Sequence, residues 1–184
     1  YGCPIGCSRY WLNEAGEMIG KRPEYEVLWS HSANLLIDDL DVIVGMCNFE
    51  NDYGVDGMDV GMALAVLMEA GIINWGDAAK CLEVVKEIGS GGYLGRIVGS
   101  GAELTARVFG VDRVSTSKGQ SLSGYDPRMS QGMGVTYSTN PQGSDNTAGF
   151  CFFTSGDNPE GQARVSFDAQ VETAAFDSIG LCGL

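Results

Sequence analysis

Three of the six cysteines are placed where their thiolates could bind a metal cluster. Cys3 and Cys7 form a C-x3-C pair near the start of the chain, and Cys182 lies near its end. Iron–sulfur clusters often combine closely spaced cysteines with one remote cysteine. The pair alone is weak support, because such pairs also bind zinc or occur incidentally. A zinc-binding interaction domain built on these three residues would lack a fourth cysteine ligand.

Two further cysteines have a different setting. Cys47 and Cys81 lie among apolar residues with helical spacing, where a free cysteine packs as a small hydrophobic side chain. The cysteine pattern therefore favours ligand thiolates in a reducing cytoplasm over a disulfide framework.

Composition narrows the possible partners. The formal net charge is −13, with 24 acidic against 11 basic residues, and the basic residues are scattered. Nucleic acid and anionic membranes are thus not expected as partners. No apolar run approaches the roughly 20 residues of a membrane span. The chain opens at Tyr1 without a signal-like segment, so we expect it to begin inside a longer protein.

Apolar periodicity predicts an all-α fold, an irregular multi-helix array with a long loop-rich segment. Helices are expected at 34–51 with Asn34 as N-cap, 58–70, 78–88, about 93–109 and about 160–176. The first 30 residues should be mostly loop, and 110–160 should be loop with short helical turns near 127–133 and 143–152. We expect two domains, 1–109 and 110–184.

Two related hexapeptides follow predicted helices. Residues 51–56 read N-x-x-G-V-D, and residues 177–182 read D-x-x-G-L-C. Locally, the first could be a helix–turn–helix joint with Asp56 as N-cap, and the second a glycine C-cap turn at Gly180. The repetition also suggests two equivalent turns that face one ligand.

These motifs resemble the aldehyde:ferredoxin oxidoreductase family of tungsten enzymes. In that family a C-x2-C-x3-C segment and a remote cysteine hold a [4Fe–4S] cluster, and paired D-x-x-G-L-D and D-x-x-G-L-C turns bind the two pterins that chelate tungsten. The resemblance extends, in the expected order, to segments 23–26 (P-E-Y-E), 34–40, 71–77, 125–128 and 132–134.

The resemblance implies roles for particular residues. Cys3, Cys7 and Cys182 would be cluster ligands, with a further ligand just before Tyr1. Five residues of the two turns would lie against the pterins, namely Asn51, Val55, Asp56, Asp177 and Leu181. Carboxylates accept hydrogen bonds from pterin N–H and amino groups, and glycine lets the backbone come close.

Three side chains are candidates for catalysis. Glu24 and Glu26 could act as acid–base residues near a metal-bound oxygen, and the resemblance favours Glu26; the alternative is that both are ordinary surface carboxylates. Asn146 stands where aldehyde-oxidising members carry histidine. Asparagine can hydrogen-bond to a carbonyl but cannot shuttle protons, which weighs against simple aldehyde oxidation. The single histidine, His31, is interpreted as a partly exposed loop imidazole, with substrate contact as the alternative.

The chain is thus expected to be part of a tungsten (or molybdenum) bis-pterin, [4Fe–4S] oxidoreductase. The substrate would be of the aldehyde/carboxylate type or a related small molecule, with electrons passed to ferredoxin or a partner subunit. In the family, an N-terminal domain of the same chain supplies much of the pterin pocket. The alternative is an inactive helical fragment or structural module without cofactor, and exposed apolar surface would then favour homo-oligomers.

Overall fold

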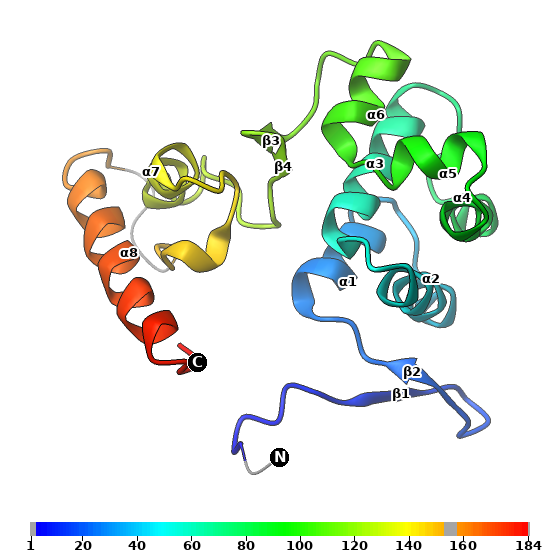
Figure 1. The fold of residues 1–184 in the computed structure, drawn as a ribbon, viewed down its shortest axis with the longest axis horizontal. Helices are drawn as coiled ribbons and strands as arrows, with labels where there is room; N and C mark the ends of the chain where they lie inside the picture. Colours follow the sequence, from blue (N-terminus) through cyan, green and yellow to red (C-terminus); the bar gives the residue numbers. More distant parts are fainter. Residues whose placement is uncertain (1–2, 153–157, 184) are drawn as a thin grey trace. The chain divides into compact units, whose positions relative to one another are not determined.

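The computed structural model describes residues 3–152 and 158–183. Within these ranges the chain forms eight α-helices, one 3₁₀ helix and two small hairpins (Figure 1), which confirms the expected all-α class. It divides into two compact units, Tyr1–Val114 and Ser115–Leu184. The boundary expected from the sequence lay a few residues earlier, after Phe109.

The first unit opens with a hairpin that the sequence did not predict. Strands β1 (Tyr10–Leu12) and β2 (Met18–Lys21) pair antiparallel. The side chain of Asn13 accepts the amide of Glu17 at 2.9 Å and closes the turn. Strands of three and four residues are too short to show a period of two, so the sequence of this stretch resembles that of a loop.

Helices α1 (Tyr25–His31) and α2 (Leu40–Tyr53) replace the predicted helix that began at Asn34. Asp39 is the N-cap of α2, and its Oδ1 accepts the amide of Val42 at 3.1 Å. Leu36 has a φ of 58°, which no right-handed helix can include. The predicted start at Asn34 was therefore wrong, because this backbone turn separates it from α2.

Helix α3 (Gly57–Glu69) contacts α1, α2, α5 and α6 and is buried on most sides, as its nearly continuous apolar sequence predicted. Asp56 is its N-cap, with Oδ1 2.7 Å from the amide nitrogen of Asp59. Helix α4 (Ala78–Ser90) is capped in the same way by Asp77. Both N-caps follow from the preference of aspartate for this position.

The predicted helix 93–109 is two helices, α5 (Tyr93–Val98) and α6 (Ala102–Phe109). Gly101 has a φ of 93°, so the chain cannot continue as one helix. The break allows α6 to pack on α3 while α5 packs on α4. Apolar side chains from α2, α3 and α4, with Val98, Ala102 and Ala106, fill one core.

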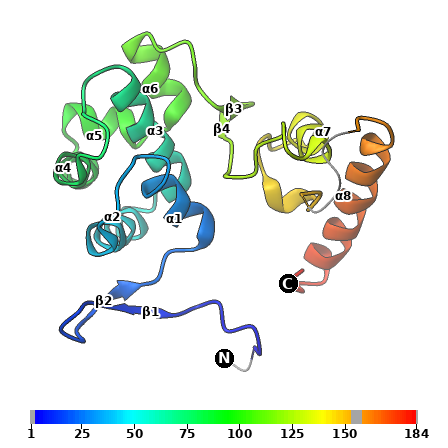
Figure 2. The same cartoon turned by 180° about the vertical axis from the view of Figure 1, so that it is seen from behind.

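The second unit contains a small hairpin whose two strands, β3 (Thr116–Ser117) and β4 (Gln120–Ser121), have two residues each. It also contains three helical segments. These are α7 (Gln131–Thr139), the 3₁₀ helix η1 (Asn146–Ala148) and α8 (Gln162–Ser178), seen from behind in Figure 2. Met133, Tyr137 and Cys151 form its core. Helix α7 overlaps the helical turn predicted at 127–133 in its first three residues and continues to Thr139. Its glycines and threonines are poor helix formers, so the sequence did not predict its full length, which burial of Met133 and Tyr137 stabilises.

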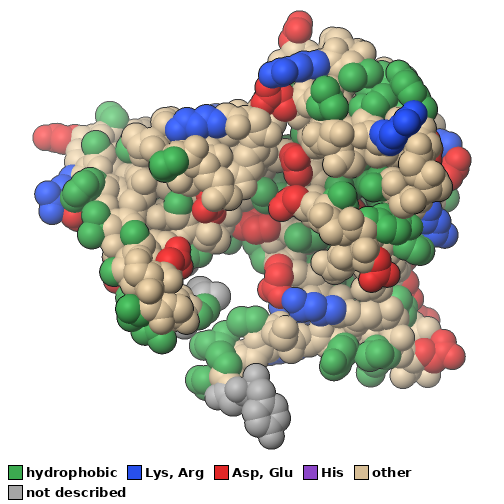
Figure 3. Space-filling view, viewed as in Figure 1, with side chains coloured by type: hydrophobic (Ala, Val, Ile, Leu, Met, Phe, Trp, Pro, Cys, Tyr) green, Lys and Arg blue, Asp and Glu red, His purple; other side chains and the backbone are tan. Residues whose placement is uncertain are grey.

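The surface agrees with the absence of a basic patch in the sequence. On the face shown in Figure 3, Lys and Arg side chains are scattered and form no continuous patch. Among the residues that the structure describes, no helix is both long enough and apolar enough to span a bilayer.

Candidate functional site

The two related hexapeptides form the same turn. In the first, the amide of Gly54 donates to the carbonyl of Asn51 (3.3 Å) and that of Val55 donates to the carbonyl of Glu50 (3.1 Å). In the second, the amide of Gly180 donates to the carbonyl of Asp177 (3.1 Å), and that of Leu181 donates to the carbonyl of Phe176 (3.0 Å). Both are Schellman C-caps, which satisfy the last carbonyls of α2 and α8.

The glycines of both turns have the left-handed backbone that this cap needs. Gly54 has a φ of 72° and Gly180 a φ of 69°, and an added Cβ at either position would meet no atom within 4 Å. The outer surface of each turn is therefore open, so that a flat ligand could approach the backbone. This openness fits the pterin-facing role that the resemblance implies.

The same cap also ends α3 and α4, at Gly71 and Gly91. There the residue that accepts from the glycine amide is apolar, Met68 in α3 and Ile88 in α4. In α2 and α8 this position holds a polar side chain, the amide of Asn51 or the carboxylate of Asp177. Side-chain chemistry, and not the turn itself, therefore sets residues 51–56 and 177–182 apart.

The second turn borders a pocket of about 380 Å³ that lies wholly within the second unit. One face of α8 forms a wall, η1 and Phe150 form another, and the chain after α8 forms the end. Its lining residues are Thr147, Phe150, Ala169, Glu172, Thr173, Phe176, Asp177, Leu181, Cys182 and Gly183. The structure thus brings three predicted site residues, Asp177, Leu181 and Cys182, to one pocket.

The pocket combines aromatic walls with oxygen acceptors. Phe150 and Phe176 supply apolar surface, while Glu172 and Asp177 supply carboxylates. Pockets of this size with few polar groups are typical of small-molecule sites. Glu172 and Phe176 were not among the residues predicted from the sequence. Their spacing of four residues along α8 places them on one face with Asp177 near its end, a signal that the sequence held.

The six cysteines form two classes, and all have free thiols. Cys3 and Cys182 are exposed and Cys7 is half-buried, so these predicted ligands are accessible. Cys47, Cys81 and Cys151 are buried, and burial raises the pKa of each, to about 12 for Cys81. This division matches the donor chemistry of a cluster, which requires thiolates that an iron atom can reach.

The two candidate acid–base residues differ in setting. Glu24 precedes α1, has a half-exposed side chain and lies 3.4 Å from the ammonium of Lys21. Glu26 lies in the first turn of α1 and is partly buried. Of the two carboxyl groups, that of Glu26 is the less exposed to solvent.

Asn146 begins η1 and is 8% exposed. The preceding Asp145 caps this turn, with Oδ1 2.8 Å from the amide of Thr147. Because Thr147 lines the pocket described above, Asn146 lies in the segment that forms one of its walls.

The interpretation of His31 as a partly exposed loop imidazole was wrong. His31 ends α1 and is fully buried, with Nε2 2.8 Å from Oε1 of Glu50 on α2. Burial by itself lowers the pKa of His31, but the Glu50 charge and the hydrogen bonds of both ring nitrogens raise the pKa more. The error arose because α1 itself was not predicted, and burial is a property of its packing against α2 and α3.

Comparison with known proteins places these features in a family. The family model described as aldehyde ferredoxin oxidoreductase, domains 2 & 3, matches residues 1–184. A tungsten-containing aldehyde ferredoxin oxidoreductase of Pyrococcus abyssi is 31% identical, over 99% of this chain and 34% of its own length. The enzyme of the same name from Pyrococcus furiosus is 30% identical over the same shares.

A subunit described as aliphatic sulfonate oxidoreductase, WOR-like, from Pyrococcus furiosus is 25% identical, over 80% of this chain and 28% of its own length. The chain thus belongs to the aldehyde ferredoxin oxidoreductase family, and it spans about a third of the length of the curated relatives that it matches.

Proposed function

We propose that the chain is the cluster-binding and pterin-binding helical part of a tungsten (or molybdenum) oxidoreductase. The observation that carries this proposal is the pocket at the end of α8, which unites Asp177, Leu181 and Cys182. In the proposed site a pterin lies over the second turn and a [4Fe–4S] cluster is bound next to it through Cys182. The equivalent turn at Asn51–Asp56 supports a second pterin.

The residues of the two turns would recognise the pterins by hydrogen bonding and by shape. The carboxylate of Asp177 accepts hydrogen bonds from ring N–H and amino groups, and the amide of Asn51 can do so through its oxygen. Val55 and Leu181 cover the ring faces. Asp56 already accepts the amide of Asp59 and so fixes the direction of the first turn.

Cys3, Cys7 and Cys182 would be three of the cluster ligands. The metal and cluster supply the two-electron chemistry and the exit path for electrons, while the protein binds, orients and tunes them. Electrons would pass to ferredoxin or to an electron-transfer subunit.

Proton transfer is assigned to Glu26, with Glu24 as the less favoured residue of the pair. Glu26 would hold a proton close to the reacting oxygen of the substrate. Asn146 would donate a hydrogen bond to a substrate carbonyl or a similar oxygen but would not move a proton. This residue set fits a small substrate of the aldehyde/carboxylate type or a related oxygen-bearing substrate.

We propose that activity requires the longer protein and that this chain alone is a helical module without turnover. The chain covers 34% of the length of its relatives, and the resemblance implies that an N-terminal domain supplies much of the pterin pocket. In the cell, the cytoplasm would provide the reducing conditions that free thiols need.

The test uses the longer protein that contains this chain, purified without oxygen and measured for tungsten, iron and pterin. Asp177→Ala should lower bound pterin and tungsten at least about tenfold, since it removes a charged acceptor from the second turn. Asp168→Ala is the matched control, because Asp168 lies on the same helix but pairs with the exposed Arg164. Full cofactor content in Asp177→Ala, or equal loss in both variants, would overturn the proposed role.

A further inference from the structure

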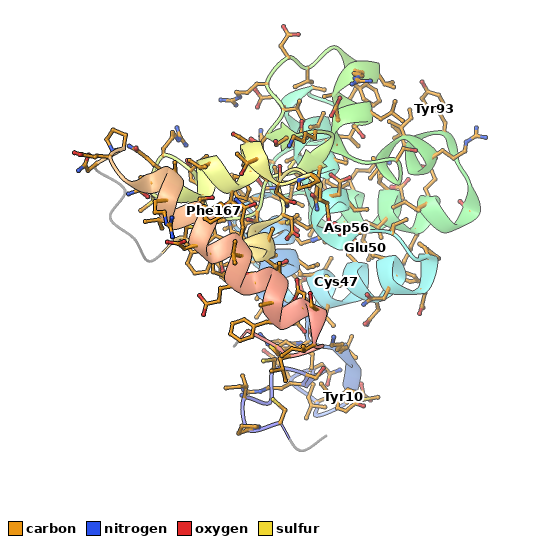
Figure 4. All side chains as sticks on the ribbon, turned by 60° about the vertical axis from the view of Figure 1, so that its left-hand side comes forward. Tyr10, Cys47, Glu50, Asp56, Tyr93 and Phe167 are labelled. Atoms are coloured by element: carbon orange, nitrogen blue, oxygen red, sulfur yellow. The ribbon has the colours of Figure 1, made fainter. Side chains whose placement is uncertain are left out.

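A second group of candidate metal ligands lies inside the first unit and is buried, unlike Cys3 and Cys182. It consists of His31 at the end of α1 and of Cys47 and Glu50 on α2, with all ligand atoms within 4.8 Å of one another. The three residues are 0%, 4% and 1% exposed. Cys47 and Glu50, both labelled in Figure 4, are three residues apart in α2, a spacing that places them on one face of the helix. We call these residues the buried triad.

The imidazole of His31 is oriented as a ligand. Its Nδ1 lies 2.9 Å from the carbonyl oxygen of Val27 and 3.1 Å from Oγ of Ser30. A carbonyl only accepts, so Nδ1 carries a proton and donates it to Val27. Nε2 then points toward Oε1 of Glu50 at 2.8 Å. A backbone carbonyl that holds one ring nitrogen while the other faces a ligand position is the usual arrangement of metal-bound histidine.

Two lone pairs cannot face each other at 2.8 Å, so either a proton or a metal ion must lie between Nε2 of His31 and Oε1 of Glu50. A proton would serve these two atoms alone. It would leave Oε2 of Glu50, which is buried and has no hydrogen-bond partner among the described residues, without compensation. An unsatisfied buried carboxylate oxygen costs the full desolvation penalty of that oxygen.

A divalent metal ion would use all three side chains of the buried triad. One oxygen of Glu50, the thiolate of Cys47 and Nε2 of His31 provide three ligand atoms, and the charge of the ion would compensate the buried Oε2 of Glu50. The charges of a thiolate, a carboxylate and a neutral imidazole balance a +2 ion, so the site would be neutral within an apolar core. Mixed nitrogen, sulfur and oxygen donors suit zinc and other ions of borderline softness.

We propose that His31, Cys47 and Glu50 form a structural site for a divalent transition metal of the zinc class. The site ties α1, which begins beside Glu24 and carries Glu26, to the end of α2, where the carbonyl of Glu50 accepts the amide of Val55. The bound ion would fix the first turn relative to α1. The proposal does not depend on the proposed oxidoreductase function.

The test uses the 184-residue chain with Cys3, Cys7 and Cys182 replaced by serine, so that no exposed thiol binds the added metal. The protein is unfolded, refolded with excess Co²⁺ or Zn²⁺, and freed of unbound metal by gel filtration. We expect about one ion per chain, since structural metals bind as the chain folds. The cobalt form should show a thiolate-to-cobalt charge-transfer band.

Cys47→Ser should abolish the charge-transfer band and lower the metal content at least about tenfold, and Glu50→Gln should lower the content without changing the sulfur ligand. Cys81→Ser is the matched control, because Cys81 is equally buried, in α4, but lies outside the triad. Circular dichroism reports folding of each variant. A refolded parent chain that shows native helicity but holds no metal would overturn the proposal, as would a band that survives in Cys47→Ser. Both results would leave a shared proton between His31 and Glu50.

Discussion

Asn51 and Asp177 occupy equivalent positions in two turns with the same hydrogen-bond pattern. The backbone carbonyl of each accepts a hydrogen bond from the amide of a left-handed glycine three residues later, at 3.3 Å for Gly54 and 3.1 Å for Gly180. The side chain at this position is a neutral amide in the first turn, Asn51, and a charged carboxylate in the second, Asp177. If the two turns hold two pterins, the second turn binds its pterin through the stronger, charge-assisted hydrogen bonds.

The left-handed turn of α2 can be tested by adding a single methyl group. Gly54→Ala should lower the free energy of unfolding by about 1–2 kcal/mol, because alanine resists a φ of 72° although the space around it is open. Gly45→Ala is the control. Gly45 lies inside the same helix and also has open space, so alanine there should raise stability by about 0.5–1 kcal/mol. Urea unfolding measures both, and equal effects would contradict the assigned turn.

The close approach of α1 and α3 depends on Gly61. A Cβ at this position would lie 2.5 Å from Oγ and 2.9 Å from the carbonyl oxygen of Ser30. Gly61→Ala should therefore destabilise the fold by about 1–3 kcal/mol. Adding Ser30→Ala should recover only part of this loss, because the backbone oxygen remains. Full recovery in the double variant would mean that the helices do not pack this closely.

The two glutamates near α1 should differ in their effect on turnover. In the longer protein, Glu26→Gln should lower kcat at least about 100-fold, the usual contribution of general acid–base catalysis. Glu24→Gln should change kcat less than about threefold, because Glu24 is half-exposed and its ion pair with Lys21 is worth about 0–1 kcal/mol. The pH profile of kcat should lose one limb in Glu26→Gln alone. The reverse order of effects would move the proton-transfer role to Glu24.

Asn146 should limit the use of aldehydes as substrates. Asn146→His in the longer protein should raise kcat for a simple aldehyde at least about tenfold, because imidazole can transfer protons near neutral pH and an amide cannot. Asn146→Gln serves as the comparison, since it keeps the amide and should bring no gain. Steady-state kinetics with an artificial electron acceptor would measure both, and unchanged kcat in Asn146→His would remove Asn146 from the site.

The two classes of cysteine should react at different rates. In the native chain at about pH 8, iodoacetamide should modify Cys3 and Cys182 at least about tenfold faster than Cys47, Cys81 and Cys151, because the buried thiols have raised pKa values and little access to reagent. Peptide mass spectrometry over time would follow each site. In urea the modification rates of these five cysteines should become similar. If the rates still differed as much in urea, burial in the folded chain would not explain the difference.

Sequence alone was sufficient wherever the physics is local. Glycine at 54 and 180 marks a left-handed cap, and aspartate at 56 and 77 marks a helix start, because each effect acts within a few residues. The pairing of the two hexapeptides and the family were also readable from residue order. The same order was enough to single out Asp177, Leu181 and Cys182.

Only the tertiary structure decided the features that depend on contacts between segments distant in the sequence. Helix α7 forms because Met133 and Tyr137 are buried, and the break at Gly101 follows from the packing of α6 on α3. His31 looked like a loop residue, yet burial against Glu50 makes it the centre of the triad. Local sequence specifies backbone turns and caps, but burial and side-chain partners arise only when distant segments exclude water together.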